Sequence, residues 1–547
     1  MVMKNKIKYC FKYIFSLVVL IGINIKDIFT AQMVAERIVY RYSYLSQIID
    51  VRVDWLLTYP IHRIKGVVNI DEKKNSIKKN WINIYNLSGE KEKVLLLYLL
   101  YNIGIFDNEI SEIVLGSICK FNNKNIRYWL TQNISKMTFF MQDGLYDDYF
   151  IDRKNLIKLC AEDMELNIPE KGIREASKKR LCIVTYLQSD ICMNSIQRYC
   201  VMTAKHMKMY YDDIKVVVLD CFIVGEDDDH SICSLFNYKS ARDRIELING
   251  FYENSADVYF CVGNNYKEKF QDAINVIYEF NPDEIMDLSD EYSIISYFYS
   301  KDFYTMNMMF RVGATSLYQT SVIWDESGDI IRQLNKRYRF VQDEEIVNWL
   351  VPEVIPCEDM CLSRIEYNIG NDDFVLLTVG HCADIVTNKF VDCISEFLNK
   401  NNDCIWLIVG DDIPEYLKVK YRGLIDNGRV ICRIYEKHIV SLCRLCDVLL
   451  RVDTTGGNGA AVIAAKNGLP IAMTDFYCDP MVWLGKDYST IDNYQDLFDF
   501  IQKLHDDNGF YLRKKKEVYE LVRNIEDSQE KWYRLHSLMK SHKKMVG

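Results

Sequence analysis

A glycine-rich segment at 454–459 is the part of the chain best suited to chemistry. It comes directly after the apolar run 448–452 and directly before the helical pattern 460–466. Glycines let the backbone approach a ligand closely, and the unpaired N–H groups at the start of a helix attract an anion. Each charge-assisted hydrogen bond contributes about 1.5 to 3 kcal/mol, so two or three suffice for useful affinity.

The segment therefore predicts a diphosphate site, and a tight turn that needs glycine only for packing is the alternative. The expected phosphate-binding residues are Thr454, Thr455, Gly456, Gly457, Asn458 and Gly459. The segment does not fit the P-loop pattern, and it lies late in its series of elements, whereas a dinucleotide fingerprint opens the first β-α unit. This position argues against both NAD-type and P-loop enzymes.

The elements that must position this segment form two series of apolar strands alternating with helical patterns. The first series has strands expected at 181–187, 216–219, 256–262 and 284–288, and it degenerates around 292–324. The second has strands expected at 374–379, 405–409, 429–434, 448–452 and 470–474. Continuous apolar strands separated by helices imply a parallel sheet covered on both faces. Two such doubly wound units leave a cleft between them, and ligands bind at the carboxyl ends of the strands.

The second series resembles the donor half of the O-GlcNAc-transferase-like and related nucleotide-sugar glycosyltransferases. The residues that carry the resemblance are Glu436-Lys437-His438, Asp447-Val448-Leu449-Leu450, the segment 454–459 and Asn467-Gly468-Leu469-Pro470-Ile471. Their order and spacing agree with that pattern from 373 to the tail.

The resemblance implies an α/β fold of the GT-B type, with two tandem Rossmann-like domains. Apolar residues at three-to-four spacing up to about 168 predict an all-α domain before them. We expect the limits 1–175 for the helical domain, 176–355 for the acceptor-side domain and 356–547 for the donor-binding domain, whose last helix crosses back. The implied activity is transfer of a sugar, a hexose above all, from a nucleotide-diphosphate donor to a glycan or protein acceptor. A UDP-sugar is the favoured donor, and neither a metal nor a separate cofactor is expected.

The resemblance also implies roles for residues outside the glycine-rich segment. His438 would contact the nucleotide or the diphosphate, or it is an ordinary first residue of a helix. Gly380, His381 and Lys389 occupy the region in which such enzymes place a cation against the diphosphate. The acidic residues of the next loop, Asp475 and Asp479, would hydrogen-bond the donor sugar, or they are solvated turn residues.

The chain departs from the retaining enzymes of this kind, which carry two Glu eight residues apart around the loop. Thr455 and Ile463 stand at those positions. Neither performs carboxylate chemistry, so the stereochemistry is undecided, with inversion slightly favoured. An inverting reaction needs a general base, for which Asp190 after the first strand is a weak candidate and a surface turn is its alternative. A non-catalytic partner or scaffold subunit of a glycosylation complex is the second hypothesis.

Composition narrows the class of protein further. The net charge of −10 argues against broad binding of nucleic acid. The 18 Cys residues show no repeated spacing and indicate core thiols in a reducing compartment, so we expect a cytoplasmic protein. The acidic run 226–229 contains an Asp-x-Asp that could hold a hard cation, but a solvated loop is the preferred interpretation.

The N-terminal region carries no recognisable chemistry. Four lysines precede an apolar run at 13–25, which is shorter than the roughly 20 residues that cross a bilayer. A buried helix or one on the membrane surface is favoured over a signal anchor. The expected location therefore includes the inner face of the membrane. A protein partner bound by the helical region is the other expectation for this part of the chain.

Overall fold

The computed structural model describes most of the chain beyond 150 and scattered parts before it. The described stretches are 108–122, 150–186, 195–219, 255–263, 266–288, 294–308, 320–323, 346–348, 361–379, 388–410, 421–433, 438–451, 458–473, 493–523 and 528–546, with Glu436 and single positions between 78 and 131 and between 484 and 491. The chain forms two compact units that divide between Thr305 and Met306.

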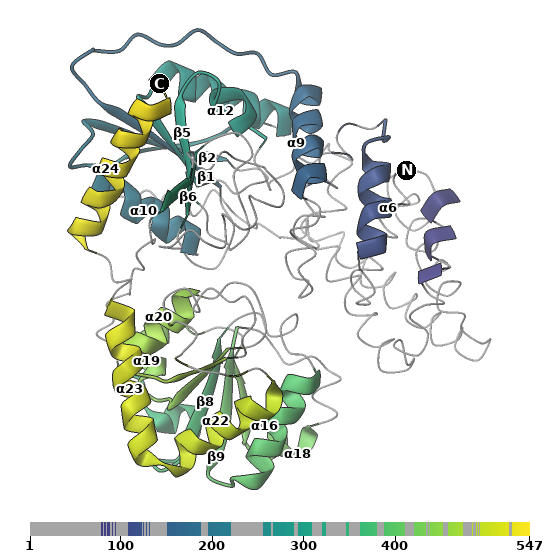
Figure 1. The fold of residues 1–547 in the computed structure, drawn as a ribbon, viewed down its shortest axis with the longest axis vertical. Coiled ribbons are helices and arrows are strands. Elements are labelled where there is room, and N and C mark those ends of the chain that lie inside the picture. The colour runs from purple at the N-terminus through teal and green to yellow at the C-terminus, as the bar shows by residue number, and fades with distance from the viewer. Residues whose placement is uncertain are drawn as a thin grey trace, which may run out of the picture. The chain divides into compact units, whose positions relative to one another are not determined.

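The first unit contains a parallel sheet with the strand order β3-β2-β1-β4-β5-β6-β7 (Figure 1). Its strands are β1 Arg180–Tyr186, β2 Asp213–Leu219, β3 Asp257–Phe260, β4 Glu284–Asp287, β5 Tyr304–Met308, β6 Thr320–Ile323 and β7 Ile346–Asn348. The four strands expected here are confirmed as β1 to β4. The unit boundary falls inside β5, whereas the hydrogen-bonded sheet continues to β7, so we take the sheet as the structural unit. The domain limits at 175 and 355 stay a prediction.

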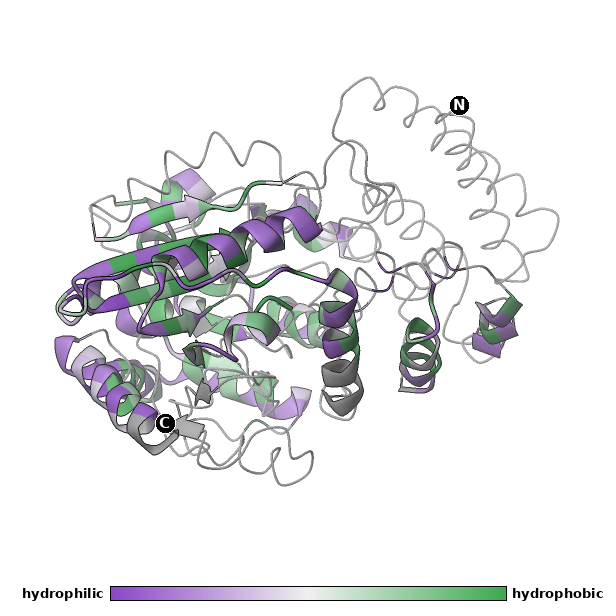
Figure 2. Ribbon diagram, turned by 90° about the horizontal axis from the view of Figure 1, so that it is seen from above, coloured by the Kyte–Doolittle hydropathy of each residue, from purple (hydrophilic) through white to green (hydrophobic). Residues whose placement is uncertain are grey.

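Amphipathic helices connect these strands. They are α10 Ser195–Met207, α12 Tyr266–Phe280 and the short α13 Ser296–Tyr299. Along α12 the side chains of Phe270, Ile274 and Ile277 are buried completely, at the spacing that puts them on one face. Figure 2 shows the same interleaving of hydrophobic and hydrophilic residues along other described helices.

The part of the N-terminal region that is described is helical. It includes α6 Asn108–Ile118 and α9 Phe150–Met164, with Trp81 and Tyr85 stacked in a shorter piece at a centroid distance of 4.5 Å. No helix within the described residues is long and apolar enough to cross a membrane. The apolar run 13–25 lies outside the described residues, so the all-α domain is confirmed only in part.

The second unit contains a five-stranded parallel sheet in the order β10-β9-β8-β11-β12. Its strands are β8 Phe374–Val379, β9 Cys404–Val409, β10 Val430–Arg433, β11 Val448–Arg451 and β12 Ile471–Met473. All five expected strands are confirmed, with ends that differ by no more than one residue. Numbered within its own unit, each sheet begins with the order 3-2-1-4-5, which is the doubly wound arrangement.

Two hydrophobic cores lie on opposite faces of this second sheet. Successive residues of a strand point to opposite faces, so Val375 and Leu377 enter one core and Leu376 enters the other. The first core is covered by α19 Ile439–Cys443, α20 Asn458–Lys466 and α23 Asn508–Val522. The second is covered by α16 Asn388–Lys400, α18 Arg422–Asp426 and α22 Tyr494–Asp506. The last helix, α24 Gln529–Val546, buries Trp532, Leu535 and Met539 along one side.

Candidate functional site

The two central strands β8 and β11 of the second sheet define the candidate site. They pair in parallel, with Leu376 beside Val448 and Leu377 beside Leu449. The strand order reverses between them, because β9 and β10 follow on one side and β12 on the other. The helix after β8 is α16 and the helix after β11 is α20, and these two cover opposite faces. The connections therefore diverge at this carboxyl edge, which is where open α/β sheets bind ligands.

The glycine-rich segment falls at this point. β11 ends at Arg451 and α20 begins at Asn458, so the segment joins the carboxyl end of a central strand to a helix N-terminus. Residues 454–457 lie outside the described residues, and of Asn458 only the helical backbone is described. Gly459 lies in the first turn of α20, half-buried, and a Cβ built on it meets nothing within 4 Å.

His438 lies at the start of α19, which packs against α20 on the same face of the sheet. Its side chain makes no capping hydrogen bond, while its backbone N–H donates to Glu436 Oε1 at 2.7 Å. The Tyr367 hydroxyl donates to the other oxygen of Glu436. Burial and this hydrogen bond raise the pKa of Tyr367 well above its ordinary value, so the hydroxyl stays a donor. Glu436 therefore fixes the backbone just before His438, a role that the sequence did not reveal.

Arg451 is a residue of this site that sequence reasoning missed. It is the last residue of β11, is 5% exposed and stands three positions before the first residue of the glycine-rich segment. Leu449, two positions earlier, enters the core under α19 and α20, so strand alternation places Arg451 on the same face. An arginine that ends an otherwise apolar strand was the available signal, because a buried guanidinium is costly without a function or a partner.

Several predicted site residues lie outside the described residues, although the strands before them are described. Gly380 and His381 come directly after β8, at the same divergence as the glycine-rich segment. Asp475 and Asp479 follow β12, and Asp190 follows β1 of the first sheet. Lys389 lies in the first turn of α16, where only its backbone is described. The position and the contacts of all these side chains stay a prediction.

The structure also shows the surroundings of Ile463, which stands where the related retaining enzymes carry one of their two carboxylates. Ile463 of α20 is 4% exposed and belongs to the core on its face of the sheet. A carboxylate at this position would be buried among apolar side chains, which strongly disfavours its charged form. The described part of α20 therefore provides packing here rather than an acid or a nucleophile.

Comparison with known proteins identifies the fold. No family model and no curated protein sequence matches the chain. A solved structure of a mutant O-GlcNAc transferase from Thermobaculum terrenum matches with a TM-score of 0.52 and 11% identity, over 91% of this chain and all of that one. HepE of Anabaena, solved with UDP and glucose, matches with a TM-score of 0.48 and 11% identity, over 66% of this chain and all of that one.

The first of these likenesses supports the architecture predicted from the sequence. Two tandem Rossmann-like units with parallel sheets form the GT-B fold of nucleotide-sugar glycosyltransferases. The matched structures also include a putative UDP-N-acetylglucosamine 2-epimerase from Listeria monocytogenes, with a TM-score of 0.41 and 11% identity over 67% of this chain and 96% of that one. At 11% identity, the likeness to the Thermobaculum terrenum structure establishes the fold alone, and the reaction has to be argued from the site.

Proposed function

We propose that this protein is a glycosyltransferase that moves a sugar from a nucleotide-diphosphate donor, a UDP-sugar above all, to a glycan or protein acceptor. The observation that carries the proposal is the position of the glycine-rich segment. It follows β11 at the point where the strand order of the second sheet reverses, and it leads directly into α20. This is the place at which a doubly wound sheet can surround a phosphate with backbone N–H groups.

The proposed chemistry needs stabilisation of a departing diphosphate. The N–H groups of the segment and the first turn of α20 would receive the negative charge, with His438 and the cationic side chains of Lys389 and Arg451 adding to it. Fixed dipoles and cations perform the role that a metal has in other transferases, so we propose that transfer requires neither a metal nor a separate cofactor. A protein with a net charge of −10 can therefore hold a polyanionic donor.

Inversion of configuration fits the site better than retention. The position of Ile463 in the core leaves α20 without one of the two carboxylates of the related retaining enzymes. An inverting displacement needs only a base on the acceptor side and a stabilised leaving group. Asp190 stays the candidate base.

A non-catalytic GT-B partner subunit is the second candidate function. The missing carboxylate pair favours it, whereas a buried Arg451 that precedes three closely spaced glycines in the sequence favours a working site. The two candidates differ in whether the protein binds a nucleotide and turns over a donor.

Nucleotide binding in the presence of a chelator tests the proposal. UDP, GDP, ADP and CMP are titrated into the full-length protein and into the Gly457→Val and His438→Ala variants. We expect one nucleotide, UDP above all, to bind at about micromolar affinity and to bind more weakly in both variants. Absence of binding by all four would favour the partner-subunit function. Mass spectrometry of products formed from UDP-sugars then separates transfer from epimerisation of the donor.

Gly459 offers a substitution that separates ligand contact from folding. Because a Cβ at this position meets no protein atom within 4 Å, Gly459→Ala should keep the fold and stabilise α20 by about 0.5 to 1 kcal/mol. A methyl group in the first turn would nevertheless crowd a phosphate held there. We expect about tenfold weaker nucleotide binding with an unchanged or higher melting temperature.

Gly423→Ala is the matched control for this substitution. Gly423 lies in α18, on the opposite face of the sheet, and also has open space beside its Cα. The control variant should bind the nucleotide like the original protein. Equal affinity in the Gly459 and Gly423 variants would place the phosphates away from α20.

A further inference from the structure

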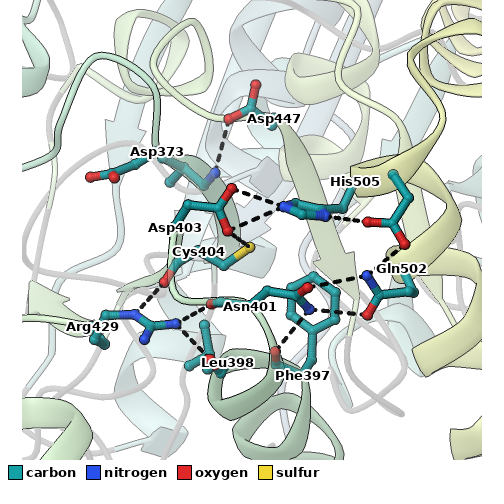
Figure 3. A network of polar contacts seen from close by, with 12 residues as sticks. Asp373, Phe397, Leu398, Asn401, Asp403, Cys404, Arg429, Asp447, Gln502 and His505 are labelled. Carbon is teal, nitrogen blue, oxygen red and sulfur yellow. Dashed lines mark hydrogen bonds and ion pairs between the residues drawn. The ribbon is translucent and has the colours of Figure 1, made fainter.

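A second polar cluster lies at the opposite edge of the second sheet, where the strands begin. Asp403 precedes β9, Cys404 is the first residue of β9, and His505 lies near the end of α22 (Figure 3). The three side chains come together although His505 is separated from the other two by about a hundred residues of sequence. The carboxyl ends that form the candidate donor site are at the other end of the same strands.

The donor atoms of this cluster have the separations of metal ligands. His505 Nε2 is 3.1 Å from Asp403 Oδ2, and Cys404 Sγ is 3.8 Å from Asp403 Oδ1. One donor atom from each of the three residues lies within 4.8 Å of the other two. In a tetrahedral zinc site with bonds of about 2.0 to 2.3 Å, neighbouring ligand atoms are about 3.3 to 3.6 Å apart. Small side-chain rotations would bring the three atoms to that geometry.

The histidine is oriented by the contacts that metal-binding histidines have. His505 Nδ1 lies 2.7 Å from Asp506 Oδ1, and the Gln502 amide donates to the other oxygen of Asp506 at 2.9 Å. Two aromatic rings, Phe374 and Phe397, meet the imidazole edge-on at centroid distances of 5.2 and 6.1 Å. Asp506 holds a proton on Nδ1, so that Nε2, which donates to Asp403 in the metal-free protein, directs its lone pair at the cluster once its own proton has left.

The charges of the surroundings also match a divalent cation. An Asp403 carboxylate and a Cys404 thiolate together neutralise two positive charges. The Arg429 Nε donates to the carbonyl of Cys404 at 2.6 Å, which places one fixed positive charge beside the first residue of β9. Asp403 is 58% exposed, so solvent can reach the fourth position, while Cys404 is fully buried.

We propose that Asp403, Cys404 and His505 form a binding site for Zn²⁺, with Asp506 orienting the histidine and a water molecule as the fourth ligand. A mixed set of one sulfur, one nitrogen and one oxygen suits this borderline-soft ion better than Mg²⁺ or Ca²⁺. Binding displaces two protons to solvent, the thiol proton of Cys404 and the Nε2 proton that His505 donates to Asp403, so that His505 binds in its neutral form and Asp403 as a carboxylate. The ion would tie the start of β9 to the end of α22 and stabilise the core between them.

Cobalt substitution tests the site directly. The full-length protein is stripped with a chelator and titrated with Co²⁺, which reports a thiolate ligand by a charge-transfer band in the near ultraviolet. We expect one equivalent of Co²⁺ to give this band, Zn²⁺ to remove it, and Cys404→Ser to lack it. Asp506→Asn should keep the band and weaken Zn²⁺ binding by about 10- to 100-fold.

Cys393→Ser is the control for the loss of a buried thiol. Cys393 lies on α16 in the same core, and its Sγ donates to the Tyr494 carbonyl at 3.3 Å, so it has no part in the cluster. This variant should keep the band, and Zn²⁺ should raise its melting temperature as it does for the original protein. A band that is absent, or that persists in Cys404→Ser, would overturn the proposal and leave His505 as a link between two carboxylates. Nucleotide binding in chelator is a separate measurement, so either proposal can fail alone.

Discussion

Replacing Arg451 by methionine is expected to weaken binding of the nucleoside diphosphate by about 10- to 100-fold, or about 1.4 to 2.8 kcal/mol. The guanidinium is buried at the end of β11, three positions before the first residue of the glycine-rich segment. A cation in such a water-poor position interacts strongly with a diphosphate that arrives beside it. Calorimetric titration with UDP in chelator measures the change.

The affinity of the Arg451→Met variant reports on ligand contact only if the variant is folded. Its melting temperature and a second variant are therefore measured as well. Removing the guanidinium leaves the group that Arg451 contacts in the protein without its partner, so the methionine variant should melt at a lower temperature while it stays folded at the temperature of the titration. Arg451→Lys retains the charge without the planar fork and should lose less affinity than Arg451→Met. A folded methionine variant with full affinity would show that Arg451 has only a structural role.

Replacing Trp406 by alanine is expected to destabilise the second unit by about 3 to 5 kcal/mol. Trp406 is 3% exposed on the central part of β9, and its ring meets Phe390 edge-on at 6.0 Å. Its Nε1 donates to the Thr378 hydroxyl of the neighbouring strand at 2.9 Å. The substitution leaves a large cavity and also removes this buried hydrogen bond. Urea unfolding followed by circular dichroism measures the loss.

Two substitutions separate the contributions of the Trp406 ring and its hydrogen bond. Trp406→Phe keeps most of the apolar volume and should cost clearly less than the alanine variant. In Trp406→Phe with Thr378→Val, the hydroxyl that lost its partner is removed too, so stability should partly recover. A phenylalanine variant as unstable as the alanine variant would mean that the hydrogen bond, rather than packing, dominates.

The strands of the second sheet were predictable because each is an unbroken apolar run. Cys404–Val409 is buried at every position, and such a strand has no competing helical pattern. Strands β5 to β7 were not predicted because their signals are weak. Tyr304–Met308 contains an asparagine and a threonine, and Ile346–Asn348 has only three residues. Their pairing depends on neighbouring strands, which a local pattern does not contain.

Some residues of the candidate site could likewise be predicted from the sequence, and others could not. The glycine-rich segment was recognisable because its three glycines fall within four residues of sequence and follow a strand pattern directly before a helical pattern. Arg451 was missed because its burial depends on the cover provided by α19 and α20. The cluster of Asp403 and His505 was also missed, because β9 and the end of α22 are brought together only by the packing of α22 on the sheet. Most of the cysteines within the described residues are buried, as expected, yet the sequence did not reveal which of these thiols has a polar neighbour.

The placement of the last helices of the second unit has a consequence for how the chain folds during synthesis. α22 covers one face of the sheet and the later part of α23 covers the other, through Leu497 and Ile501 on one side and Val518 and Val522 on the other. One apolar face therefore stays incompletely covered until α22 has left the ribosome, and the other until residues near 522 have done so. The central strand β8 has to wait for β11, about 70 residues later, before both of its edges are paired. Nascent chains that stop before 493 should consequently depend on chaperones, whereas the finished chain should not.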